Sequence, residues 1–71
     1  MAEQIRAELV ANVLSVLVSA GDAVSAGQPV VIMESMKMEI PVLAERGGTV
    51  TAVSVAEGDV VQEGDVMVEL G

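Results

Sequence analysis

The chain has 71 residues, of which 52% are hydrophobic and none is aromatic, and its formal net charge is −8. A chain of this length buries only about 60% of its unfolded surface, so we expect residues 1–71 to form one small domain. Without aromatic rings it lacks the usual means of stacking bases or planar cofactors. Three basic residues against eleven acids cannot neutralise a run of phosphates or anionic lipids. Nucleic acids and membrane surfaces are therefore not expected as partners.

Cysteine and histidine are absent from the sequence. This excludes thiol catalysis, Ser-His-Asp arrangements, disulfide frameworks and the usual zinc sites. The N-terminal segment lacks the basic and then apolar layout of a secretion signal, and no apolar run approaches the roughly 20 residues that span a bilayer. We expect a soluble, cytoplasmic protein that is a monomer in isolation.

An internal repeat divides the chain into two halves. Shifting the sequence by 37 positions aligns residues 5–34 with residues 42–71 without a gap, and ten of these 30 pairs are identical. The identical positions of the first copy are Ala7, Glu8, Val13, Val16, Val18, Gly21, Asp22, Val24, Gly27 and Val31. Both copies contain the pattern Gly-Asp-x-Val-x-x-Gly, in which glycine and aspartate favour a tight reversal and the aspartate is expected to bond the backbone two residues on. Two copies of one unit predict a domain with pseudo-twofold symmetry.

Each copy has the composition of β-structure, because short runs rich in valine, isoleucine, threonine and leucine are separated by glycine, aspartate, asparagine and proline. The expected strands are Gln4–Leu9, Val13–Val18, Ala23–Val24, Val30–Glu34, Glu39–Val42, Val50–Val55, Val60–Val61 and Val66–Leu70. The repeat also predicts which side faces the core. Val31 and Met33 align with apolar residues of the second copy, whereas Ile32 aligns with Glu69, which marks the solvent side.

A calcium site is the functional alternative for the acids of the second Gly-Asp turn. Asp59, Glu63 and Asp65 are closely spaced, but they lack the Asp-x-Asp-x-Asp-Gly loop and the distal glutamate of an EF-hand. We therefore expect no metal site.

The segment that joins the two copies contains Lys37, the only lysine in the chain. The strands expected on either side make this segment a hairpin with Met36 and Lys37 at or beside its turn, where a polar side chain is exposed. A lysine in a turn is common and by itself indicates nothing. Here it is unique, it lies near the midpoint of the duplication, and Met36 and Met38 flank it. In an extended strand these two methionines lie on one face, opposite Lys37, and we expect both to be partly exposed and available to partner proteins. Met33 is expected in the core.

A lysine amine is protonated at neutral pH and is a poor nucleophile unaided. Activation requires burial or a neighbouring cation, and the nearest charged residues are the anions Glu34 and Glu39. Lys37 would therefore need an enzyme to align it with an activated acyl donor. The sequence predicts a substrate protein with no catalytic residues of its own.

The motif Glu34-Ser35-Met36-Lys37-Met38 resembles the Glu-Ala-Met-Lys-Met signature of biotinyl domains, the biotin carboxyl carrier branch of the biotinyl/lipoyl attachment family. The resemblance covers nearly the whole chain and implies an all-β, flattened barrel of two four-stranded antiparallel sheets. It also implies biotin in an amide bond on Lys37, attached by a biotin protein ligase. The partners it implies are a biotin carboxylase, which loads the carboxyl group, and a carboxyltransferase, which delivers it to an acyl-CoA or a 2-oxo acid.

Two alternatives remain open at this point. A lipoyl carrier domain of a 2-oxo acid dehydrogenase-type complex resembles the same fold, although Asp-Lys-Ala is usual at its lysine. The other alternative is an interaction module whose lysine stays unmodified. The sequence agrees with a free-standing carrier and equally with a fragment of a larger carboxylase. Ser35 replaces the usual alanine, and this small-for-small change puts little in doubt.

Overall fold

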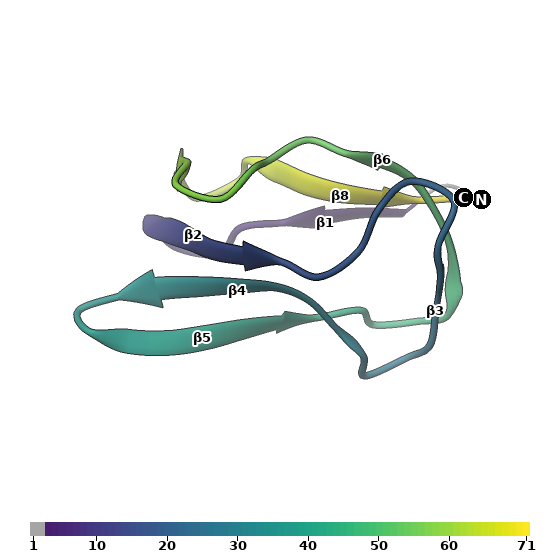
Figure 1. Cartoon of the computed structure of the whole chain (residues 1–71), viewed down its shortest axis with the longest axis horizontal. Helices are drawn as coiled ribbons and strands as arrows, with labels where there is room; N and C mark the ends of the chain where they lie inside the picture. The colour runs from purple at the N-terminus through teal and green to yellow at the C-terminus, as the bar shows by residue number, and fades with distance from the viewer. Residues whose placement is uncertain (1–2) are drawn as a thin grey trace.

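The computed structural model describes residues 3–71, which form eight β-strands and contain no helix (Figure 1). The strands are β1 (Glu3–Arg6), β2 (Ala11–Val16), β3 (Ala23–Val24), β4 (Pro29–Ser35), β5 (Met38–Leu43), β6 (Gly48–Val53), β7 (Val60–Val61) and β8 (Val66–Leu70). All eight expected strands are present, and most boundaries differ by one to three residues. In particular, β1 ends at Arg6 and not at Leu9, directly after a register shift between Ile5 and Arg6, although the buried Ala7 still donates its N–H to the Asp65 carbonyl at 2.8 Å.

The strands pair into two antiparallel four-stranded sheets, with the orders β1-β8-β6-β3 and β5-β4-β2-β7. The two sheets pack into the flattened barrel expected from the sequence, so the predicted fold class is confirmed. Within the part of the chain that is described, no helix is long and apolar enough to cross a membrane.

The pairing register repeats after 37 residues, which confirms the pseudo-twofold relationship. The pair Val13 and Met33 in one sheet corresponds to Val50 and Leu70 in the other. The pair Glu3 and Leu70 likewise corresponds to Ile40 and Met33. The register shift within β2 also recurs at the equivalent place in β6. Each copy therefore contributes two strands to each sheet.

A single cluster of small and aliphatic side chains fills the space between the sheets. Its members are Ile5, Ala7, Ala11, Val13, Val18, Val24, Val30, Val31, Met33, Ala44, Val50, Val61, Met67, Val68 and Leu70. Val31 and Met33 are buried together with their mates Val68 and Leu70, whereas Ile32 and Glu69 are only half-buried. The face predicted from the repeat is therefore the core face, and β-branched and unbranched aliphatics supply the packing without any aromatic ring.

Two equivalent reversals close the copies at the Gly-Asp patterns. Gly21 and Gly58 have φ angles of 97° and 91°, which is the left-handed region that glycine enters without a steric penalty. The Asp22 carboxylate accepts a hydrogen bond from the Ser19 N–H at 2.8 Å, three residues before it in the chain. The sequence led us to expect a bond to the backbone two residues after the aspartate, and that expectation was wrong. The turn explains why the carboxylate bonds to Ser19: the Asp22 N–H donates to the Ser19 carbonyl at 3.0 Å, and this bond brings Ser19 and Asp22 together.

Candidate functional site

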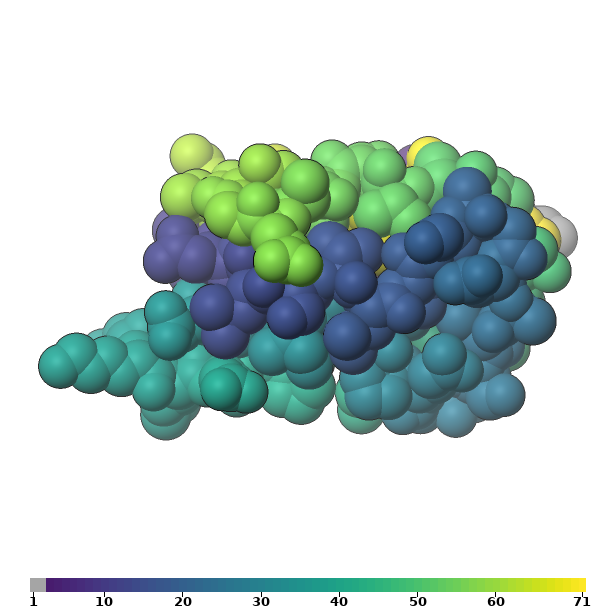
Figure 2. Space-filling view, viewed as in Figure 1, coloured from purple at the N-terminus to yellow at the C-terminus, as the bar shows by residue number. Residues whose placement is uncertain are grey.

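Lys37 lies at the tip of the β4–β5 hairpin. Ser35 pairs with Met38, so Met36 and Lys37 are the two residues of the turn, as expected. The hairpin extends beyond the paired part of β2, and Figure 2 shows it as a tapering projection at one end of the molecule. The start of β1 and the end of β8 lie at the opposite end (Figure 1). This arrangement holds the lysine on two rigid strands, away from the body of the barrel.

The turn forces both of its residues into an unfavourable backbone region. Met36 and Lys37 have φ angles of 53° and 65°, the left-handed values required at both central positions of a two-residue type I′ turn. Asparagine and glycine are the usual residues there, and a residue with a Cβ costs about 1–2 kcal/mol. Strain of this kind is common at functional sites, where the side chains are needed for something other than stability.

This geometry corrects the interpretation of the two methionines as neighbours on one face of an extended strand. Met36 belongs to the turn itself, while Met38 is the first residue of β5 and is paired with Ser35. Met38 shares its side of β5 with Ile40 and Val42, because side chains alternate along a strand. The expected exposure is confirmed, since 90% of Met36 and 62% of Met38 is accessible to solvent. Met33 is buried, as predicted.

The next pair along the hairpin consists of two acids. Glu34 lies opposite Glu39, and Glu34 is also opposite Asn12 on the other side of β4. Carboxylates that face each other across antiparallel strands repel. The sequence identified Glu34 and Ser35 as members of the motif, but it did not indicate that Glu39 and Asn12 lie in the same row. The strand alternation would have placed them there once the turn was known to have two residues.

The Lys37 side chain is exposed, and within residues 3–71 its amine takes part in no ion pair or side-chain hydrogen bond. An amine in this position is free to enter the active site of another protein and to form an amide there. The arrangement suits a covalently attached acyl group, because only the amine is required of the chain and no pocket around it is needed.

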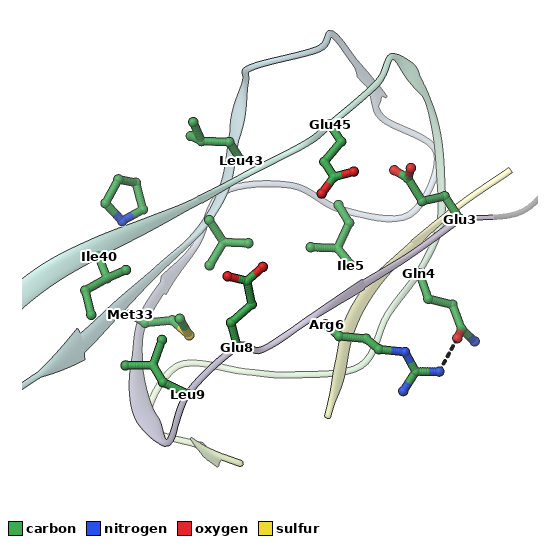
Figure 3. A pocket seen from close by; sticks show the side chains of 12 residues that line it. Glu3, Gln4, Ile5, Arg6, Glu8, Leu9, Met33, Ile40, Leu43 and Glu45 are labelled. Atoms are coloured by element: carbon green, nitrogen blue, oxygen red, sulfur yellow. Dashed lines mark hydrogen bonds between the residues drawn. The ribbon is translucent and has the colours of Figure 1, made fainter. Parts of the chain in front are cut away.

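A cleft in the described part of the chain lies elsewhere. It has a volume of about 350 Å³ and opens between the edge strands β1 and β5 (Figure 3). Aliphatic side chains such as Ile5, Leu9 and Ile40 line it together with the acids Glu3 and Glu45, and it contains none of the motif residues from Glu34 to Met38. The described residues include no group of three or more potential metal ligands.

A family model described as "Biotin-requiring enzyme" matches residues 3–70. The chain belongs to this family of biotin-requiring enzymes. The membership of the biotinyl/lipoyl attachment family expected from the sequence is thereby confirmed, and biotin is the prosthetic group of the family.

Relatives of this chain include small proteins of about the same size. The chain is 58% identical to the biotinylated protein TB7.3 homolog of Mycobacterium leprae over 67 residues, which is 94% of both chains. It is 52% identical to the biotin/lipoyl attachment protein of Bacillus subtilis over 63 residues, or 89% and 86% of the two chains. Among solved structures it is similar to the urea carboxylase of Kluyveromyces lactis, with a TM-score of 0.92 and 32% identity. That match covers the whole of this chain but only 6% of the carboxylase.

Proposed function

We propose that this chain is a biotin carboxyl carrier domain and that Lys37 is its site of biotin attachment. The observation that supports the site most directly is the projection of an exposed lysine, the only one in the sequence, from the tip of a rigid hairpin. The family requires biotin, and an amide on this amine is the attachment that the geometry allows. The single-domain organisation expected for residues 1–71 and the cytoplasmic location remain predictions.

We infer that a biotin protein ligase modifies Lys37. The neutral amine attacks the acyl carbon of biotinyl-adenylate, the C–N bond of the amide forms, AMP leaves with the electrons of the acyl–phosphate bond, and the amine gives up a proton. Lys37 contributes the nucleophile, and the ligase must supply both alignment and deprotonation, because within residues 3–71 no side chain forms a hydrogen bond or ion pair with the amine. The chain is thus a substrate and a carrier, not an enzyme.

The motif residues around the lysine are proposed to position it for the ligase. Met36 and Met38 offer flexible apolar contact surface on either side of the amine, which suits more than one partner. Ser35 closes the turn through its pairing with Met38, and Glu34 begins the acidic row behind it. Attached biotin would carry a carboxyl group between a biotin carboxylase and a carboxyltransferase, whose acceptor we propose to be an acyl-CoA or a 2-oxo acid. The carrier itself needs only to present the arm and to stay folded.

A lipoyl carrier is the second candidate, because the related Bacillus subtilis protein is described as a biotin/lipoyl attachment protein. The methionines on both sides of Lys37 favour biotin, because lipoyl domains usually have Asp-Lys-Ala at their lysine and this chain has Met36-Lys37-Met38. The third candidate is an interaction module in which Lys37 stays unmodified, and this candidate gives the exposed amine no role.

Intact-mass measurement separates these candidates. The purified chain is incubated with ATP and either biotin and a biotin protein ligase or lipoate and a lipoate ligase, and its mass is recorded over time. We expect the mass of one biotinyl group to be added and no lipoyl group. The matched variant Lys37→Arg should remain folded and unlabelled. Lipoylation that is as fast as biotinylation, or no modification in either reaction, would contradict the proposal.

A further inference from the structure

We propose that the outer face of the sheet β5-β4-β2-β7 is the surface on which the biotin protein ligase docks. This inference rests on the proposed function, and it identifies which of two otherwise equivalent faces the ligase uses. The face, called here the apolar face, consists of Leu14, Leu17, Ile32, Pro41 and Leu43.

The pseudo-twofold symmetry supplies an internal control for this surface. The equivalent positions on the outer face of β1-β8-β6-β3 are Thr51, Ser54, Glu69, Gln4 and Arg6, called here the polar face. Each of these five positions is apolar on one sheet and polar on the other, although the backbone pairing is the same; the pair Ser15 and Ala52 shows the opposite change, and Pro29 and its mate Val66 are both apolar. The fold therefore accepts polar side chains at these positions, and nothing in the packing of the barrel requires apolar ones.

The residues of the apolar face are not part of the core. Leu14 and Ile32 are half-buried, yet neither belongs to the core cluster nor to the partly buried side chains packed against it. Ile32 of β4 pairs with Pro41 of β5 on one side and with Ser15 of β2 on the other. These three residues therefore form one row across the sheet. Leu17 and Leu43 are 51% and 47% exposed. The face therefore combines these five apolar side chains with the polar Ser15, and burial of its apolar part by a partner would be favourable.

The polar face is, in contrast, complete in itself. The Gln4 amide donates to the Glu69 carboxylate at 3.3 Å, and the Thr51 hydroxyl donates to the Glu69 carbonyl at 3.2 Å. The Arg6 guanidinium donates to the Gly64 carbonyl at 2.7 Å. Four of its five side chains thus take part in hydrogen bonds within the chain, as expected of a surface that stays solvated.

The apolar face continues onto the hairpin that presents Lys37. Glu34 and Glu39 lie on the same outer side of the hairpin as Ile32 and Pro41, because side chains two residues apart share a face. The surface thus changes from apolar in the middle of the sheet to acidic near the lysine. A complementary partner has an apolar patch that is bordered by lysine or arginine on the side toward its active site. The ligase is the proposed partner that must take up the Lys37 amine itself, so it must contact the hairpin end of this face.

A second copy of the chain is a poorer occupant. Each copy has a net charge of −8, and face-to-face packing of two identical apolar faces would bring two Glu34–Glu39 rows into one assembly. Repulsion between like charges opposes such a dimer. A ligase whose apolar patch has a basic border is instead attracted by the negative charges of Glu34 and Glu39.

The test compares biotinylation kinetics of matched variants. Leu14→Thr combined with Ile32→Gln replaces the centre of the apolar face by neutral polar residues of the type found at Thr51 and Glu69. The control, Thr51→Leu combined with Glu69→Ile, makes the reverse change on the polar face. With ligase, ATP and biotin, we expect kcat/KM of the first variant to fall about tenfold or more, the size of effect that follows loss of a central interface side chain. Its kcat at saturating carrier and the kcat/KM of the control should stay within about twofold of the original chain.

Circular dichroism and intact-mass measurement of the same samples make each outcome decisive. If the original chain is labelled but the folded Leu14→Thr/Ile32→Gln variant reacts at the same rate, docking on this face is wrong while the proposed function stands. An equal loss in the control also overturns the proposal. If the double variant does not fold, the exposed Leu43→Gln change replaces it and is judged by the same kcat/KM criterion. A chain that no ligase labels overturns both proposals, and a stable homodimer buried on this face overturns the assignment to the ligase.

Discussion

Glu34 and Glu39 lie directly opposite each other on the two strands of the hairpin that ends in Lys37. Two facing carboxylates next to a strained turn make the hairpin less stable than its length and pairing allow. Both features lie at the junction of the repeated halves, and neither has a counterpart elsewhere in the described part of the chain. The hairpin thus has the sequence of a recognition element and not that of an optimised turn.

Neutralising one member of this pair should stabilise the chain. Glu39→Gln removes the repulsion with Glu34, and we expect the free energy of unfolding to rise by about 0.2–1 kcal/mol at low salt. The gain should shrink as salt screens the charges. Urea unfolding at low and high salt measures both effects. The control is Glu57→Gln, which removes one negative charge in the same way but at an exposed loop position. An equal gain in the control would assign the effect to net charge alone.

The turn offers a second test, because its stability and its function require different residues. Replacing Met36 by asparagine and Lys37 by glycine supplies the residues that a type I′ turn prefers, and should raise the free energy of unfolding by about 1–2 kcal/mol. The same variant loses the amine and should never be biotinylated. Urea unfolding together with intact-mass measurement checks both results. A variant that is less stable than the original chain would show that the native turn residues make stabilising contacts.

The core should be far more sensitive than the apolar face. Met33 is 2% exposed, and Met33→Ala should cost about 2–5 kcal/mol through lost burial and the cavity left behind. Leu70, its mate in the other sheet, is also 2% exposed and should show a similar loss on change to alanine. For 71 residues the total stability is expected to be roughly 4–11 kcal/mol, so either change removes a large part of it. Leu43→Ala, at an exposed position, should change the urea midpoint little.

The two Gly-Asp turns should respond equally to substitution. Gly21 and Gly58 have φ angles of 97° and 91°, and an added Cβ would meet no atom within 4 Å at either place. Backbone strain is therefore the only cost, and Gly21→Ala and Gly58→Ala should each lower the free energy of unfolding by about 1–2 kcal/mol. Thermal or urea unfolding of the pair measures it. Clearly unequal losses would mean that the two halves do not share one turn geometry.

The internal repeat made most of the fold predictable from the sequence. Aligning the two copies showed which side of β4 faces the core, because Ile32 and Glu69 cannot both be buried, and this prediction is confirmed. The position of Lys37 in a turn followed from the strands on either side of it. Both results depend on alternation and composition, which act locally and are visible in the chain.

The parts that could not be predicted depend on atomic details of pairing. The relation of Met36 to Met38 was wrong because it depends on the turn having two residues with positive φ, and composition does not specify this. The end of β1 at Arg6 follows a register shift against β8, a strand that is far away in sequence. The apolar face was hidden for a similar reason, since the register shift beside Leu14 changes which residues share a side.

The most direct test of the central claim is to locate the modification within the chain. After reaction with biotin, ATP and a biotin protein ligase, the protein is digested and the labelled peptide is sequenced by tandem mass spectrometry. The account predicts one biotinyl group, on the peptide that contains Lys37, and none in the Lys37→Arg variant. Biotin at any other position, or a folded chain that the ligase leaves unmodified, would contradict it.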